Sequence, residues 1–172
     1  MKLGIVIWFL FVILGGLSCG SDKQSESELF NKASTFEDNK SYDEAIQGYE
    51  KVVREYPDGK MADEALEREA FLYYNNVHDF HKAIALHKRV IEEYPNSRSV
   101  ARARFMIGFI YANDLKDYDL ARTAYEQFLS HHPEDELAES VKWELEHLGQ
   151  DISEQLLNAF QPDDTDGATR TN

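Results

Sequence analysis

The 172-residue chain is 42% hydrophobic, which is enough for a packed core and excludes a wholly disordered protein. Nine glycines and four prolines are too few for a turn-rich all-β fold, and the single cysteine, Cys19, excludes an internal disulfide. The net charge of −14 makes nucleic acid an unfavourable partner and argues against docking of the protein surface onto anionic lipid.

Residues 1–18 have the features of a signal peptide. Lys2 supplies a basic start, and the uncharged stretch that follows is shorter than the roughly 20 residues that span a bilayer. This stretch ends at Cys19, preceded by the small Ser18. Residues 21–28 are polar and predict a tether, so we expect the fold to begin at about Leu29.

The end of this segment resembles a bacterial lipoprotein signal. The resemblance implies that residues 1–18 are removed and that Cys19 is lipidated as the new N-terminus. The residue after it is Gly20 and not Asp, which by the same resemblance implies the outer membrane. The alternative is an uncleaved anchor helix with an incidental cysteine.

Three kinds of landmark residue recur every 38 positions along the rest of the chain, which indicates an internal repeat. They are good helix N-cap residues, small residues one turn later, and prolines. The three sets are Ser41, Asp79 and Asp117; Ala45, Ala83 and Ala121; and Pro57, Pro95 and Pro133.

Each landmark has a physical role in a predicted helix. The N-cap residue begins the helix, and Ser41 with Glu44 has the form of a capping box. The alanine permits close approach of a second helix, and the proline ends the element because the residue before it is pushed out of helical geometry. An apolar stripe at helical spacing lies between them.

The other half of each repeat is another amphipathic helix, which precedes the capped helix in the chain. We expect such helices at residues 29–36, 62–74, 100–112 and 139–148, the last with Gly149 as its C-cap. Residues 152–160 carry apolar side chains at helical spacing and predict a terminal helix that covers the open end of the array. Residues 161–172 are polar and Asp-rich, which predicts a disordered tail.

The third repeat resembles the tetratricopeptide pattern. It reads Ile107-Gly108-x-x-Tyr111, followed by Ala121, Tyr125, Phe128 and Pro133. The resemblance implies an all-α fold over residues 29–160, a tetratricopeptide-repeat solenoid of about three helical hairpins plus a C-terminal capping helix pair.

The long turns after Pro57 and Pro95 narrow the resemblance. They look like the variant found in BamD-like outer-membrane assembly lipoproteins and in the periplasmic Tol–Pal coordinator family. The first likeness implies a non-catalytic scaffold at the periplasmic face of the outer membrane, held there by its lipid anchor, that binds envelope proteins or unfolded outer-membrane protein segments. The second implies a regulator that coordinates cell-wall synthesis with envelope constriction.

The sequence favours neither an enzyme nor a metal site. It contains no Gly-rich phosphate loop and no catalytic serine or zinc-protease motif. Two histidine pairs, His78 with His81 and His131 with His132, fall near turns without the further ligands that a closed metal site needs. We therefore expect no catalytic residue, metal, cofactor or small-molecule substrate.

By resemblance to tetratricopeptide arrays, the first helix of each hairpin lines a groove for partner proteins. Ala33, Ala70 and Gly108 serve as register marks for this face, where aromatic side chains commonly anchor partners. The predicted groove residues are Phe30, Glu67, Phe71, Tyr74, Phe105, Phe109, Asn113 and Trp143. The alternative for any of the large side chains is packing between hairpins.

Overall fold

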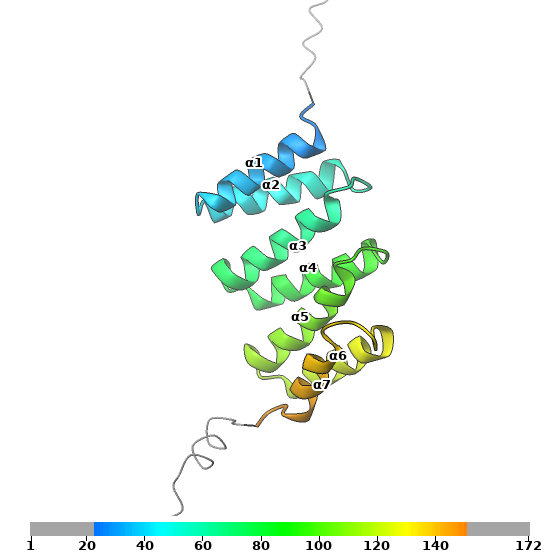
Figure 1. Ribbon diagram of the computed structural model, residues 1–172. Coiled ribbons are helices and arrows are strands. Elements are labelled where there is room, and N and C mark those ends of the chain that lie inside the picture. Colours follow the sequence, from blue (N-terminus) through cyan, green and yellow to red (C-terminus); the bar gives the residue numbers. More distant parts are fainter. Residues whose placement is uncertain (1–22, 151–172) are drawn as a thin grey trace, which may run out of the picture.

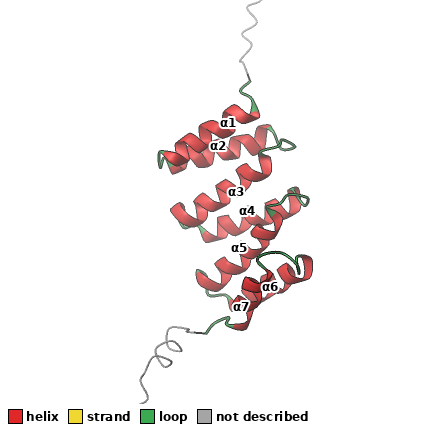
Figure 2. Cartoon of the chain, in the orientation of Figure 1, coloured by secondary structure: helices red, strands yellow, loops and turns green. Residues whose placement is uncertain are grey.

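The computed structural model describes residues 23–150, which form helices joined by short turns (Figures 1 and 2). The helices are α1 (Glu26–Asp38), α2 (Tyr42–Glu55), α3 (Ala62–Leu72), the π-helix η1 (Tyr73–Val77), α4 (Phe80–Glu93), α5 (Val100–Asn113), α6 (Tyr118–His131) and α7 (Ala138–Glu146). Each helix packs on the one before it and the one after it, from α1 at one end of the stack to α7 at the other (Figure 1).

This arrangement confirms the predicted all-α, tetratricopeptide-like solenoid. Three hairpins, α1–α2, α3–α4 and α5–α6, are followed by α7, a fourth first helix. Four predicted features lie outside the described residues. They are the signal peptide, Cys19, the partner of α7 at residues 152–160 and the tail at residues 161–172. No helix within residues 23–150 has the length and apolar character needed to cross a membrane.

The fold begins earlier than the polar composition predicts. Ser25 and Glu28 form a capping box: the Glu28 amide donates to Ser25 Oγ at 3.3 Å, and the Ser25 amide donates to Glu28 Oε2 at 2.8 Å. These bonds satisfy two free amides at the helix start, so α1 begins at Glu26 and not at Leu29. Part of the predicted tether is therefore the first turn of the array.

Aspartates form the N-caps of α4 and α6. Asp79 Oδ1 accepts from the Lys82 amide at 2.9 Å, and Asp117 Oδ1 accepts from the Leu120 amide at 3.1 Å, as predicted. The capping box predicted at Ser41 is wrong, because this serine makes no side-chain cap bond. Its ψ of 69° is far from the extended value of 159° at Ser25, and the shorter serine side chain does not reach the amides that an aspartate reaches at similar ψ.

A left-handed residue precedes each of these caps. Lys40, His78 and Lys116, again 38 positions apart, have φ of 60°, 60° and 56°. None is a glycine, so each turn holds a side chain in a conformation that glycine adopts more easily. In the second hairpin η1 continues the helical chain to Val77, beyond the end at residue 74 that the sequence predicts.

The turns between hairpins follow the prolines. Helices α2, α4 and α6 end two residues before Pro57, Pro95 and Pro133, as predicted. The tyrosines that precede the first two prolines tie distant turns together: Tyr56 bonds the segment before α1 of its own hairpin, and Tyr94 bonds the turn of the preceding hairpin. Tyr56 donates its hydroxyl to the Gln24 carbonyl at 2.6 Å, and Tyr94 donates to the Pro57 carbonyl at 2.9 Å.

The core lies between the helices at the positions that the repeat marks. Ala45, Ala83 and Ala121 are fully buried, which agrees with their predicted place at close helix crossings. The largest fully buried side chains include Tyr49, Tyr125 and Phe128, all on second helices. Small residues on one helix thus meet large residues on its neighbour, which is the packing that a close-packed interior requires.

Candidate partner-binding face

The first helices of the hairpins share one face, which we call the first-helix face. Two positions per repeat define it, and they recur every 37 or 38 residues. The first position holds Phe30, Glu67, Phe105 and Trp143, and the second holds Ser34, Phe71, Phe109 and His147.

A continuous row of aromatic rings crosses the middle of this face. The ring centroid of Tyr74 lies 6.5 Å from that of Phe109, and Phe109 lies 5.8 Å from Phe105. Phe105 in turn lies 6.3 Å from Tyr125 on α6. The structure therefore brings together three predicted groove residues from two hairpins.

The other predicted aromatics occupy separate environments. Phe30 packs edge-on against Tyr49 of its own hairpin, with ring centroids 5.4 Å apart. Trp143 stacks on His147 of its own helix at 4.5 Å. Neither ring joins the central row, so the row is confined to the second and third hairpins.

Exposure separates rings that can anchor a partner from rings that fill the core. Phe71 is 50% exposed and Trp143 is 48% exposed, whereas Tyr74, Phe105 and Phe109 are half-buried and Tyr125 is fully buried. A half-exposed phenylalanine in a surface that is otherwise well packed offers apolar area to a partner at little cost in stability. Phe71, one turn from Tyr74, is the most accessible part of the aromatic surface.

Glu67 differs from the prediction because it is not open to a partner. The residue is 7% exposed, and Ser99 Oγ donates to its Oε2 at 2.7 Å. Arg102 Nε forms an ion pair with the other carboxylate oxygen. This hydrogen bond to Glu67 raises the pKa of the Arg102 guanidinium above its usual value. Glu67 thus joins α3 to α5 as a buried, fully paired carboxylate.

Two asparagines lie at the C-terminal ends of the first helices of the second and third hairpins, counting η1 as the end of α3. Asn113 Nδ2 donates to the Phe109 carbonyl at 3.1 Å, and Asn75 Nδ2 donates to the Phe71 carbonyl at 3.1 Å. Both side chains are exposed. The remaining N–H and the side-chain oxygen of each amide therefore face outward, where they can pair with the backbone of an extended segment. The sequence prediction missed Asn75, although the 38-residue period points to it from Asn113.

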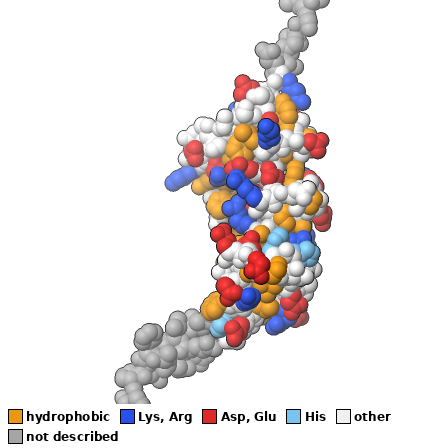
Figure 3. All heavy atoms as spheres, turned by 45° about the vertical axis from the view of Figure 1, so that its right-hand side comes forward, with side chains coloured by type: hydrophobic (Ala, Val, Ile, Leu, Met, Phe, Trp, Pro, Cys, Tyr) orange, Lys and Arg blue, Asp and Glu red, His pale blue; other side chains and the backbone are white. Residues whose placement is uncertain are grey.

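The basic group nearest to Phe71 along the helix is paired within the protein. Arg68, one turn before Phe71, lies 3.4 Å from Glu37 Oε1 and 3.9 Å from Glu64 Oε1. Figure 3 shows acidic and basic side chains intermingled with hydrophobic ones over the visible surface, with neither sign gathered into one patch. Arg68 therefore presents no unpaired positive charge beside Phe71, although the protein as a whole is strongly acidic.

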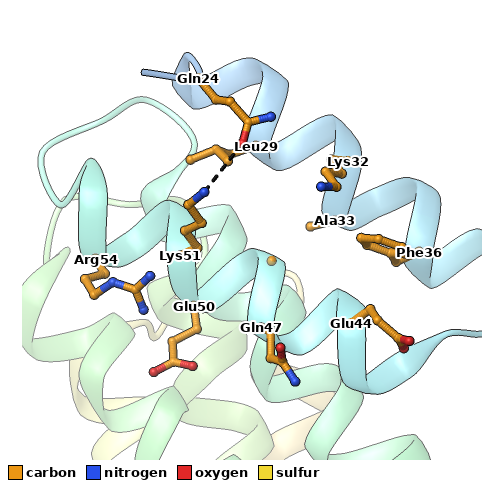
Figure 4. Close-up of a pocket in the computed structure, with 11 residues that line it drawn as sticks. Gln24, Leu29, Lys32, Ala33, Phe36, Glu44, Gln47, Glu50, Lys51 and Arg54 are labelled. Carbon is orange, nitrogen blue, oxygen red and sulfur yellow. Dashed lines mark hydrogen bonds between the residues drawn. The ribbon is translucent and has the colours of Figure 1, made fainter. Parts of the chain in front are cut away.

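A shallow groove lies between α1 and α2, away from the aromatic row (Figure 4). Its lining mixes charged and polar side chains, among them Lys32, Glu44 and Lys51, and Lys51 Nζ donates to Gln24 Oε1 at 3.5 Å. These groups do not converge on a common point in Figure 4. Within residues 23–150 there is also no group of three or more His, Cys, Asp or Glu side chains placed to hold a metal ion.

Comparison with known families agrees with this architecture. Residues 22–148 match the YfiO family, whose description is outer membrane lipoprotein. The chain belongs to the YfiO family. None of the curated proteins compared with the chain matches it. As a YfiO family member, the protein is an outer membrane lipoprotein, which confirms the predicted family resemblance and location. The match spans all of the described helices, so the solenoid is the part that the family shares.

Proposed function

We propose that this YfiO family lipoprotein is a non-catalytic scaffold, anchored by a lipid on Cys19 at the periplasmic face of the outer membrane. It binds a partner protein or an unfolded outer-membrane protein segment on the first-helix face during outer-membrane protein assembly. The observation that carries the proposal is the half-exposed Phe71 beside the aromatic row of Tyr74, Phe105 and Phe109.

The chemistry of this face suits an extended apolar segment. The aromatic rings offer apolar contact, and large rings at the centre of an interface contribute most of the binding free energy. The free groups of Asn75 and Asn113 can satisfy backbone amides and carbonyls of the bound chain, which would otherwise lose their water partners. Because Arg68 is paired with Glu37 and Glu64, it does not require an acidic group from the bound segment.

The test compares two exposed hydrophobic residues. Phe71→Ala removes a ring from the first-helix face, and Leu120→Ala removes a side chain of similar exposure, 45%, from α6. Both variants should melt close to the wild-type temperature, because each truncates a half-exposed side chain. Phe71→Ala should lose most of the partner captured from detergent-solubilised envelope, and Leu120→Ala should not.

Photo-crosslinking identifies what binds. A photoreactive residue at position 71 should crosslink to assembly-machine subunits or outer-membrane protein segments. Recovery of cell-wall synthesis or constriction proteins at that position would instead favour the Tol–Pal coordinator alternative. Wild-type capture by Phe71→Ala, together with no crosslink at position 71, would remove this face from the binding site.

A further inference from the structure

The first and third hairpins each join an aromatic residue on the first helix to one on the second. Phe30 packs on Tyr49, with ring centroids 5.4 Å apart, and Phe105 packs on Tyr125 at 6.3 Å. In the middle hairpin Glu67 and His87 occupy the same two repeat positions. The first and third hairpins thus cover the first-helix ring with a ring of their own second helix, and in the middle hairpin Ser99 and Arg102 of the next hairpin cover Glu67.

The last first helix has no such partner among the described residues. Trp143 on α7 stands 38 positions after Phe105, and it remains 48% exposed with only His147 of its own helix stacked on it. Tyr118, at the start of α6, is 41% exposed. Large apolar surface is therefore left open at this end of the solenoid, where repeat arrays require a cap.

The chain leaves the described region beside this open surface. A Cβ placed on Gly149 would lie 3.3 Å from the Tyr118 ring, so the chain at Gly149 passes next to the start of α6. The second helices α4 and α6 also begin just after a first helix ends. The described chain thus ends at the point in the repeat where a second helix would begin.

The sequence after Gln150 has the pattern that this place requires. Ile152, Leu156 and Phe160 are four residues apart, which puts them on one face of a helix. Residues 152–160 number nine, as do the residues of α7, so a helix over them matches α7 in length. Antiparallel pairing about a turn at Gly149 puts the first two turns of this segment, with Ile152 and Leu156, beside Trp143.

We propose that residues 152–160 pack on α7 as the second helix of a fourth hairpin, with Leu156 against Trp143. This segment closes the apolar end of the solenoid with the chain's own residues. It also removes Trp143 from the partner-binding face, which then consists of the second and third hairpins. The inference does not depend on the proposed function, because it concerns a different end of the molecule.

Tryptophan fluorescence tests the proposal directly. The chain has two tryptophans, so in a Trp8→Phe background the emission of the full-length protein reports on Trp143 alone. Leu156→Asp should shift this emission to longer wavelength and increase its quenching by acrylamide. Asn158→Asp is the matched control, because it adds the same charge on the opposite face of the segment and should change neither value.

Two fluorescence outcomes would overturn the proposal. One is equal emission and quenching for both variants. The other is emission of the unsubstituted protein that depends on its concentration, which would show that a second copy covers Trp143. Hydrogen exchange on the unsubstituted chain provides an independent measurement if Leu156→Asp fails to fold. Amides of residues 154–160 should exchange more slowly than those of residues 164–172, and equal fast exchange would contradict the packing.

Discussion

The Tyr125 ring lies directly against the backbone of Gly108: a Cβ added to this glycine would stand 2.5 Å from Cδ1 and Cε1 of the ring. The first hairpin has a similar crossing, where a Cβ on Gly48 would stand 2.7 Å from the Cβ of Ala33. In both hairpins the absence of one side chain sets how closely the two helices approach. Gly108 therefore serves packing, although glycine weakens a helix.

Gly108→Ala should destabilise the protein because the added methyl group overlaps the Tyr125 ring. Overpacking of this kind costs roughly 1–3 kcal/mol, which exceeds the helix propensity gain of about 1 kcal/mol. Urea unfolding followed by circular dichroism measures the change. Ala85→Gly at an exposed position of α4 calibrates the propensity contribution. A Gly108→Ala variant as stable as the wild type would show that the ring moves aside freely.

Lys116→Gly and Lys40→Gly should each stabilise the fold. Both lysines hold a left-handed backbone, at φ of 56° and 60°, which costs a residue with a Cβ about 1 kcal/mol that glycine does not incur. Part of the gain is lost to the greater freedom of glycine in the unfolded chain, so we expect about 0.5 kcal/mol from each.

The control for the lysine series is Lys32→Gly, within α1, where the backbone is helical. It should destabilise the protein by about 1 kcal/mol. Thermal melts of the three variants give the comparison. Destabilisation by all three variants would contradict the claim that the left-handed backbone at Lys40 and Lys116 costs stability.

Glu69 should make stability fall as the pH rises. It is buried on α3, and its Oε2 has no hydrogen-bond partner within residues 23–150. Burial is the main cause that raises its pKa to about 7, with a smaller contribution in the same direction from Glu50, while Lys82 and Arg89 act in the opposite direction. The folded state thus holds this proton more tightly than the unfolded state. Its stabilising effect is complete below about pH 4.5 and is lost as the pH rises through 7.

Glu69→Gln tests this dependence, because glutamine keeps the shape of the side chain without a charge. At pH 8 the variant should be more stable than the wild type by on the order of 2 kcal/mol, since one pKa unit corresponds to about 1.4 kcal/mol. At pH 4.5 the difference should be small. Glu92→Gln on the exposed face of α4 is the control and should show no such trend. A stability difference for Glu69→Gln that is the same at both pH values would contradict the raised pKa.

Cys19→Ser should release the protein from the outer membrane fraction. Lipid attachment requires the thiol, and a single Cys19 leaves no alternative site in the chain. Fractionation shows the location, and mass spectrometry of the wild-type N-terminus shows the modification. The control Ser18→Ala keeps a small residue before the cysteine and should remain membrane-bound. An unmodified wild-type N-terminus, or one that starts elsewhere, would contradict the anchor.

Local signals determined the order and the type of the helices. Asp79 and Asp117 cap their helices, and Pro95 follows the end of α4, because a cap or a helix end involves only a few consecutive residues. The 38-residue period then extended these local assignments along the chain. The start of α1 was harder to place, because Ser25 and Glu28 lie in a stretch whose polar composition resembles a linker.

Only the tertiary structure decided which side chains of the first-helix face are open. Glu67 and Phe105 occupy equivalent repeat positions, yet Glu67 is buried under Ser99 and Arg102 of the next first helix. Phe71 and Phe109 are also equivalent, but Phe71 is exposed whereas Phe109 packs between Tyr74 and Phe105. A repeat pattern places a residue on a face of its own helix. Its burial depends on the side chains of the neighbouring helices, and these differ from one repeat to the next.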